Sequence, residues 1–107
     1  MESYNWKSQT SKKKGEGIYL KTVHSGRMTV AHWSFDADTD LPEHSHPHEQ
    51  IALLQEGRFA LMVQGEEREL EPGEVVVIPP DVPHSGRAIT ASRVIDIFSP
   101  VREDMRD

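Results

Sequence analysis

Residues 41–57 read LPEHSHPHEQIALLQEG, and this stretch places three of the six histidines within five positions. His44 and His46 are two residues apart, so an extended chain directs their side chains to the same face. Gln50 has the same parity and falls on that face as well. An HxH pair on a strand can offer two imidazoles to one transition metal. The stretch therefore indicates a metal site, and the alternative is a solvated histidine loop.

A further ligand must come from elsewhere, and the stretch GEVVVIPPDVPH (residues 73–84) ends on a histidine. Its three prolines exclude regular structure just before His84 and stiffen the loop that presents it. Cysteine is absent, so any metal must bind nitrogen and oxygen donors. We expect a divalent transition metal, which imidazole and oxygen donors allow to be nickel, iron, manganese, cobalt or zinc. Its expected ligands are His44, His46, Gln50 and His84.

The composition is that of a small, acidic and hydrophilic chain. Its 107 residues suffice for one domain with a modest core, and its formal net charge is −6. Negative charge disfavours broad contact with phosphate backbones, and the basic run Lys12–Lys14 reads as a solvated lead-in. No apolar run approaches the roughly 20 residues of a membrane-spanning helix, and residues 1–10 show no secretory signal. We expect a cytoplasmic protein with neither nucleic-acid nor membrane partners.

Short strand-like runs separated by turn residues recur from residue 17 onward, without a long helical period. The expected strands are Ile18–His24, Arg27–Phe35, Gln50–Gln55, Arg58–Gln64, Glu67–Leu70, Glu74–Ile78, Gly86–Ile89 and Arg93–Phe98. Residues 36–40 (DADTD) read as a polar loop, and the apolar run Glu74–Ile78 is typical of a buried strand. The series is typical of an antiparallel sandwich or barrel. We expect one all-β domain over residues 17–107, preceded by a flexible segment over residues 1–16.

The run RVIDIF (residues 93–98) carries a second group of candidate residues. Asp96 and Phe98 alternate onto one face, and an aspartate in so apolar a run is costly to bury unless it is paired or functional. Arg102 follows shortly after, and a planar guanidinium can hold a carboxylate by two hydrogen bonds. Two readings stay open. Asp96 and Arg102 face a cavity and serve proton transfer on a carboxylated substrate, or they pair with each other and hold the tail.

The two histidine motifs resemble those of the cupin family. The first motif's HxH pair, acidic residue and glycine correspond here to His44, His46, Gln50 and Gly57, and the second motif's glycine, proline and histidine to Gly73, Pro79 and His84. The sequence departs from the pattern at Asp38 and Asp81, which stand in glycine positions, at Gln50 in place of glutamate, and at Ala88 in place of asparagine. The resemblance implies a double-stranded β-helix, or jelly-roll barrel.

Glutamine in the glutamate position changes the chemistry of the expected site. The amide binds a metal through a neutral carbonyl oxygen, so the four ligands together carry no charge. We expect weaker metal affinity and a stronger Lewis acid. Alternatively, Gln50 hydrogen-bonds a ligand histidine and does not touch the metal.

The HSHPHxQ run (residues 44–50) together with DIFSPVRED (residues 96–104) is similar to small cupins of the KdgF type, from pectin and alginate breakdown. That resemblance implies an isomerase-like enzyme that linearises 4,5-unsaturated monouronates to open-chain keto-uronates. It implies that the three histidines and Gln50 bind the metal and that Asp96 and Arg102 are catalytic. It also places Phe98 and Arg102 against the substrate.

Two other functions remain as alternatives. One is an oxygen-using cupin dioxygenase, and the other is a non-catalytic cupin that binds a small acid or sugar. In each case the partner is a small carboxylated or sugar molecule. We also expect a two-fold homodimer, because the strand Ile18–His24 could cover its edge by pairing with a partner's sheet. His48 is expected at the rim, His32 is expected in the core or at the rim, and Glu49 is expected to point away from the metal.

Overall fold

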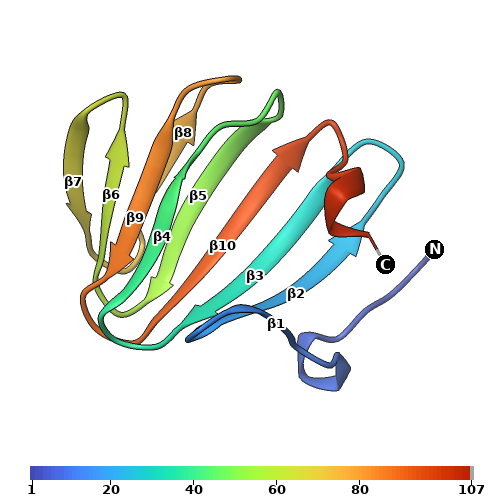
Figure 1. The fold of residues 1–107 in the computed structure, drawn as a ribbon. Helices are drawn as coiled ribbons and strands as arrows, with labels where there is room; N and C mark the ends of the chain where they lie inside the picture. The colour runs from blue at the N-terminus through green and yellow to red at the C-terminus, as the bar shows by residue number, and fades with distance from the viewer. Residues whose placement is uncertain (107) are drawn as a thin grey trace.

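The computed structural model describes residues 1–106, in which ten strands form two antiparallel sheets that face each other (Figure 1). The six-stranded sheet has the order β1 (Lys12–Gly15), β2 (Ile18–His24), β3 (Thr29–Phe35), β10 (Ser92–Ser99), β5 (Glu49–Glu56) and β8 (Val75–Ile78). The four-stranded sheet has the order β4 (Thr39–His44), β9 (His84–Ala88), β6 (Phe59–Val63) and β7 (Glu66–Leu70). Two short 3-10 turns, Trp6–Ser8 and Glu103–Met105, lie near the ends of the chain. The expected all-β jelly roll is confirmed.

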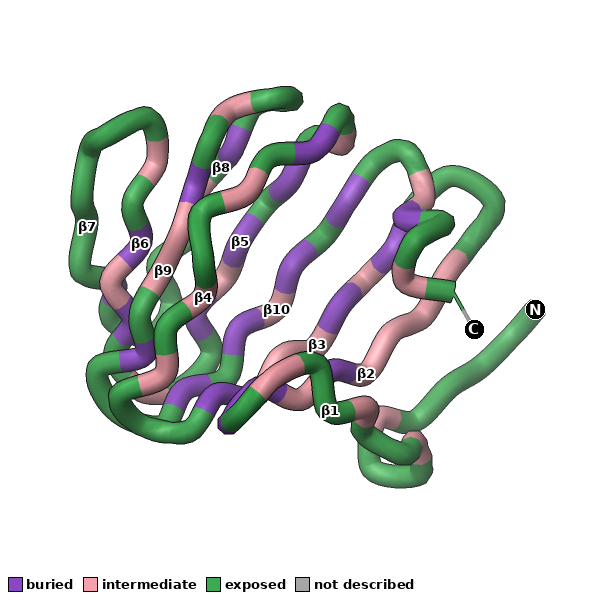
Figure 2. The backbone as a smooth tube through the Cα atoms, in the orientation of Figure 1, coloured by how far each residue is buried: buried purple, intermediate pink, exposed green. Residues whose placement is uncertain are grey.

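Burial alternates along the central strands, because one face of each sheet packs inward and the other meets solvent (Figure 2). On β10 the side chains of Val94, Asp96 and Phe98 are buried, as their parity predicts. The main core comprises Ile18, Phe35, Leu54, Phe59, Leu61, Leu70, Ile78, Ala88 and Val94. Burying one such large apolar side chain stabilises the fold by about 1.5–3 kcal/mol.

Strand β10 lies between β3 and β5, and its register determines what surrounds Asp96. Asp96 is directly opposite Ala31 on β3 and Ala52 on β5. Both alanines are buried, so the carboxyl side chain has a methyl group on either side instead of a bulky neighbour. Space therefore opens above the sheet at the centre of its inner face.

Three turns follow the cupin pattern even where the residue type departs from it. Gly57 has φ +91°, and a Cβ there would collide with the carbonyl oxygen of Ala91. Asp38 and Asp81 stand in glycine positions and adopt φ values of +62° and +64°. Aspartate is one of the few residues that tolerate this left-handed conformation. These two departures therefore keep the turn geometry that a glycine would give.

The structure places strands where the sequence suggested none. Strand β1 lies within the segment expected to be a flexible lead-in, and it pairs with β2 from Lys12 to Gly15. Strand β4 begins inside the expected DADTD loop, at Thr39.

Asp107, the last residue of the expected domain, lies outside the described residues. Across residues 1–106, no helix has the length and apolar character needed to cross a membrane.

One expectation about strand environment is wrong, and another holds only in part. Strand β8 was expected to be buried, but it is the edge strand of the six-stranded sheet, and Val75 and Val77 are 57% and 60% exposed. Apolar composition alone does not distinguish a central strand from an edge strand whose outer face is apolar. Strand β1 covers the first part of β2, because its register pairs it with residues 18–20, and within residues 1–106 no strand pairs with the remainder of β2 on that side. The expected dimer therefore keeps only a shorter part of the edge on which it was argued, and it stays a prediction.

Candidate metal centre and cavity

Three histidines converge where the loops after β4 and before β9 meet. His44 ends β4, His84 begins β9, and the two are cross-strand partners. His46 follows in the loop between β4 and β5. One ring nitrogen of each histidine lies within 4.8 Å of the other two. The three predicted histidine ligands are therefore brought together.

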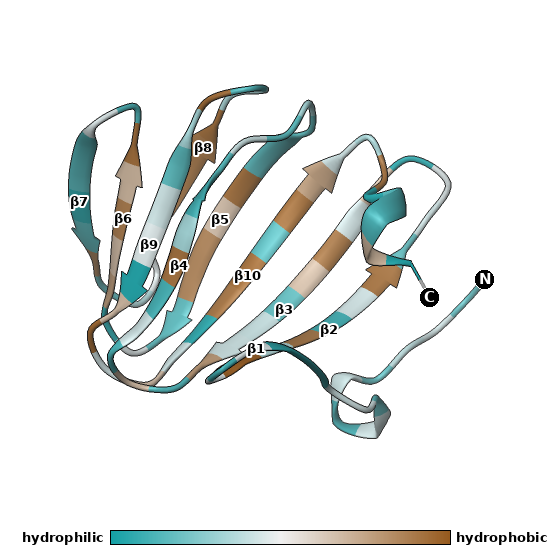
Figure 3. Ribbon diagram, in the orientation of Figure 1, coloured by the Kyte–Doolittle hydropathy of each residue, from teal (hydrophilic) through white to brown (hydrophobic). Residues whose placement is uncertain are grey.

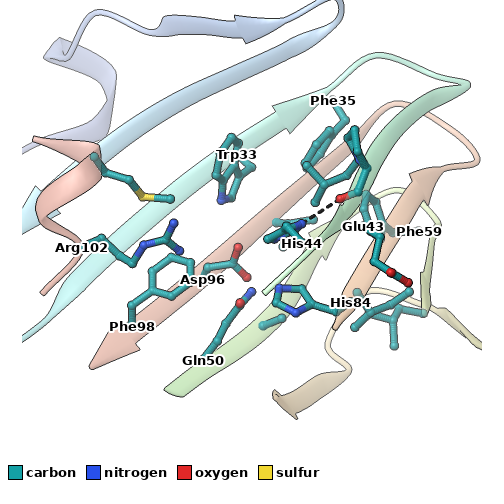
Figure 4. Close-up of a pocket in the computed structure, with 17 residues that line it drawn as sticks. Trp33, Phe35, Glu43, His44, Gln50, Phe59, His84, Asp96, Phe98 and Arg102 are labelled. Carbon is teal, nitrogen blue, oxygen red and sulfur yellow. Dashed lines mark hydrogen bonds between the residues drawn. The ribbon is translucent and has the colours of Figure 1, made fainter. Parts of the chain in front are cut away.

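The orientation of each imidazole is fixed by a backbone carbonyl two residues away. Nδ1 of His44 donates to Pro42 O at 2.8 Å, a bond drawn in Figure 4, and Nδ1 of His84 donates to Val82 O at 2.8 Å. Nδ1 of His46 donates to the carbonyl of His48 at 3.0 Å. Because a carbonyl only accepts, the proton of each neutral ring is on Nδ1 and the lone pair is on Nε2. Metal-binding histidines are oriented in this way.

Burial favours the neutral form of two of these rings. Desolvation lowers the pKa of both His46 and His84, and the nearby Arg102 charge acts in the same direction. Nε2 of His84 is buried and has no hydrogen-bond partner among the described residues. A buried lone pair without a donor is costly, and a cation would satisfy it. The donor set and its tautomers therefore fit a divalent transition metal.

Gln50 completes the group from β5. Its side chain is buried, and Oε1 lies 3.1 Å from Nε2 of His46. With the ring proton on Nδ1, these two atoms both present lone pairs. A cation between them would satisfy both lone pairs, whereas a hydrogen bond from Gln50 to His46 would need the amide nitrogen in place of the oxygen.

His44 and His84 border a cavity of about 330 Å³ between the two sheets (Figure 4). Its polar lining consists of Glu43, His44, Gln50, His84, Asp96 and Arg102. Aromatic and aliphatic side chains line the rest, among them Trp33, Phe35, Phe59, Leu61 and Phe98. A concave, mostly apolar cavity with a few converging polar groups is the usual form of a small-molecule site.

Asp96 is the charged group at the centre of this cavity. One hydrophilic band interrupts the hydrophobic middle of β10 (Figure 3), and the side chain there is only 7% exposed. Burial raises the pKa of Asp96 to about 7, against the opposing influence of Gln50, Trp33 and the Arg102 charge. Its Oδ1 is buried and accepts no hydrogen bond within the described residues. A buried carboxyl group with a free oxygen facing a cavity is typical of a functional residue.

Arg102 closes one end of the cavity. Its guanidinium carbon lies 4.6 Å from the centroid of the Phe98 ring. Its backbone N–H donates to Oγ1 of the fully buried Thr29 at 2.9 Å, which fastens the C-terminal segment to β3. Two guanidinium nitrogens, Nε and Nη2, bind the carboxylate of Asp104. No ion pair joins Arg102 to Asp96 in residues 1–106.

Sequence reasoning overlooked two residues of this site. Asp104 pairs with Arg102, and the only signal was the RED tripeptide at residues 102–104. Trp33 lines the cavity, and its parity on the inner face of β3 was the available signal. Of the remaining histidines, His32 packs against Trp6 with ring centroids 5.4 Å apart and is not among the cavity-lining residues.

The neighbours of the metal ligands lie as their sequence positions suggested. Glu49 is exposed, and His48 is partly buried and contributes its carbonyl to His46. Neither residue belongs to the three-histidine cluster. The rim position expected for His48 and the outward direction expected for Glu49 agree with this arrangement.

Known proteins resemble this chain over most of its length. The structure of KdgF from Halomonas sp. has a TM-score of 0.95 and 30% identity, covering 99% of both chains. A RmlC-like cupin from Shewanella frigidimarina has a TM-score of 0.92 and 27% identity, covering 96% of this chain and 94% of that one. The uncharacterized protein SCO3923 of Streptomyces coelicolor is 30% identical over 86 residues, 79% of this chain and 82% of that protein. The cupin domain matches residues 31–98, which include both histidine motifs, so this chain belongs to the cupin family.

Proposed function

We propose that this protein is a metal-dependent enzyme that opens the ring of a 4,5-unsaturated monouronate. The observation that carries the proposal is the position of Asp96, a buried carboxyl group with a free oxygen in the cavity that two histidines of the three-histidine cluster also line. The Halomonas KdgF is similar to this chain over its full length, and the reaction that the KdgF-type resemblance implies supports the choice of substrate. The partner is accordingly a small molecule that carries a carboxylate and hydroxyl groups.

The reaction is an isomerisation, so all atoms are retained. The C1 hydroxyl of the sugar loses its proton, the bond from C1 to the ring oxygen breaks, and C1 becomes an aldehyde. The ring oxygen takes the electron pair and remains on C5 as an enolate, which becomes a ketone when C4 receives a proton. The net change is therefore one proton moved from an oxygen to a carbon.

Asp96 is the residue that moves this proton. General acids and bases work best when their pKa is near the pH of the reaction, and burial raises the pKa of Asp96 to about 7. The carboxyl group is held on a central strand between two alanines, and at 7% exposure it is shielded from bulk water. A metal held by His44, His46, His84 and Gln50 would act as a Lewis acid that polarises a substrate oxygen.

Arg102 and Phe98 position the substrate. Asp104 occupies Nε and one hydrogen of Nη2, which leaves the remaining N–H groups of the guanidinium for the uronate carboxylate. Phe98 packs under the guanidinium and forms part of the cavity wall beside it. The carboxylate would thus be bound at the Arg102 end and the reacting centre would lie over Asp96.

The test is direct. Tag-free protein is loaded separately with nickel, iron, manganese, cobalt or zinc and is mixed with 4,5-unsaturated galacturonate. Consumption of the conjugated double bond lowers the ultraviolet absorbance, and we expect this loss with at least one metal. Asp96→Asn protein carrying the same metal is the matched control. If no metal supports the loss of absorbance, the proposal is wrong, and oxygen consumption with an iron-loaded sample would indicate a dioxygenase instead.

A further inference from the structure

Trp33 and Asp96 are diagonal neighbours on the inner face of the six-stranded sheet. Trp33 lies opposite Val94, two residues before Asp96 on the same strand, and Asp96 lies opposite Ala31. Diagonal partners on one face lie about 7–8 Å apart between Cα atoms, which a long aromatic side chain can span. Figure 4 shows both side chains in the cavity, with Arg102 at the same end.

Each of these two side chains has one buried polar atom without a partner. Nε1 of Trp33 and Oδ1 of Asp96 are both buried, and neither has a hydrogen bond of regular geometry with the described residues, although the indole lies near enough to the carboxyl group to oppose the rise in the pKa of Asp96. An indole nitrogen can only donate, whereas an ionised carboxylate can only accept. Native proteins seldom leave buried groups of this kind unsatisfied. A ligand that accepts from the first and donates to the second would satisfy both at once.

A hydroxyl group has this combination of properties, since its oxygen accepts while its proton is donated. We propose that Trp33 is a substrate-binding residue whose indole N–H donates to a hydroxyl oxygen of the substrate while the proton of that hydroxyl points to Oδ1 of Asp96. This inference rests on the proposed function for the identity of the substrate. The class of ligand that it names is wider than unsaturated uronates. It comprises hydroxy acids whose carboxylate binds Arg102 and whose hydroxyl lies between Trp33 and Asp96.

The indole is well placed to select its ligand. It stacks on Phe35, with ring centroids 6.0 Å apart and planes 19° apart, and it packs against both core clusters. Its N–H is therefore directed by packing before any ligand arrives. A site with fixed polar groups strongly rejects a molecule that lacks the matching hydroxyl, because those groups stay unsatisfied when it binds.

The fluorescence of Trp33 provides a readout that does not depend on turnover. The sequence contains two tryptophans, and Trp6, which contacts His32, does not line the cavity. In Trp6→Phe protein, Trp33 is the only indole, so a ligand bound beside it should change its emission. D-galacturonate, a saturated hydroxy acid, serves as the probe. We expect saturable quenching or a spectral shift, and unchanged emission up to millimolar probe would overturn the inference.

Trp33→Phe tests the hydrogen bond itself, because it keeps an aromatic ring and removes the donor. By calorimetry, we expect the Kd for D-galacturonate to rise about tenfold, the effect of one neutral hydrogen bond. The Kd for tetrahydropyran-2-carboxylate, which has the ring and the carboxylate but no hydroxyl, should change less than twofold. Trp6→Phe is the matched control and should leave both affinities unchanged. Equal weakening of both ligands would show that Trp33 only shapes the cavity, and the inference would fail.

The proposed function and this inference can fail separately. If the protein does not consume unsaturated uronate but Trp33→Phe still selectively weakens D-galacturonate binding, the proposed reaction is wrong and the hydroxy-acid site stands. If turnover is found and Trp33→Phe leaves both its KM and the D-galacturonate affinity unchanged, the reaction stands and Trp33 has no role in binding.

Discussion

The carboxylate of Asp104 holds the guanidinium of Arg102 by two hydrogen bonds, Nε to Oδ1 at 3.0 Å and Nη2 to Oδ2 at 2.8 Å. The Arg102 side chain is 10% exposed and that of Asp104 is 61% exposed, so the carboxylate lies on the solvent side of the pair. Arg102 therefore does not form the structural ion pair with Asp96 that the sequence left open. The tail is fastened without use of the carboxyl group in the cavity.

Arg102→Lys should weaken substrate binding more than it slows turnover. Lysine keeps the charge but loses the planar group that binds Asp104 on one edge and a substrate carboxylate on the other. We expect KM to rise about tenfold with a smaller change in kcat. Steady-state kinetics on unsaturated uronate measures both. A fall in kcat at constant KM would place Arg102 in the chemical step instead.

Asp104→Asn is the companion change. It removes the charge that aligns the guanidinium and leaves the N–H groups of Arg102 intact. We expect a smaller rise in KM than in Arg102→Lys, with the metal content unchanged. If the two variants are indistinguishable in KM, Asp104 has more than an aligning role.

Metal binding should depend on each of the three histidines. His44→Ala, His46→Ala and His84→Ala each delete one donor and should each remove most of the bound metal from tag-free protein. Gln50→Ala should cost less, because water can replace a neutral oxygen ligand. Elemental analysis gives the stoichiometry, and His32→Ala, which alters a histidine outside the cluster, is the matched control. One equivalent of metal in the triple-histidine variant would mean that the site has been assigned to the wrong residues.

Acid should release the metal at a pH below the ordinary histidine pKa. Bound imidazoles must be neutral, so protons compete with the metal. Burial lowers the pKa of His46 and His84 below the usual value of 6.5, and these rings stay neutral to a lower pH than exposed histidines do. Binding should therefore persist at pH 6.5 and fall as the pH drops further. Release that is complete above pH 6.5, measured by equilibrium dialysis, would contradict this.

Asp96→Asn should separate chemistry from metal binding. The amide keeps the shape of the side chain and cannot exchange the proton, so turnover should fall by about 10²–10⁴-fold. Metal content should match that of the parent, because Asp96 is not among the proposed ligands. Full activity in this variant would end the proposed mechanism.

The same substitution should stabilise the metal-free protein at high pH. The pKa of Asp96 is 3.8 when unperturbed and about 7 in the fold, so between these values the unfolded chain is ionised while the folded chain keeps the proton. Stability therefore falls as the pH rises from about 4 to 7, by roughly 4 kcal/mol in total. Asp96→Asn removes this loss. Thermal melting should show a more stable variant at pH 8 and little difference at pH 4, whereas a structural ion pair predicts destabilisation at pH 8.

The homodimer remains a prediction, and the structure suggests another surface for it. Ile97, Ile51 and Val77 are cross-strand neighbours on the outer face of β10, β5 and β8, and they are 38%, 38% and 60% exposed. In a dimer, this row would pack against the same row of the second copy and become buried. Sedimentation should give about twice 12.1 kDa for the parent and a smaller mass for Val77→Lys. A parent mass near that of one chain at micromolar concentration refutes the dimer.

The sequence predicted those features that depend on local spacing. Side-chain direction alternates along any strand, so residue positions alone predicted that His44 and His46 share a face and that Asp96 lies on the inner face of β10. It missed β1, since KKKG has no apolar alternation and this strand is defined by its pairing with β2. It misjudged β8, because only the tertiary order of strands determines which one lies at an edge. The partner of Arg102 and the free N–H of Trp33 were equally out of reach, since both depend on where side chains end in space.

The two alanines beside Asp96 affect the size of ligand that the cavity can hold. Ala52 lines the cavity directly, so its methyl group sets the width of the space above the carboxyl group. Substitution by valine or leucine would narrow that space without altering any of the proposed metal ligands or the reacting carboxyl group. Ligand size is therefore adjustable at one position of this scaffold, independently of the atoms that react.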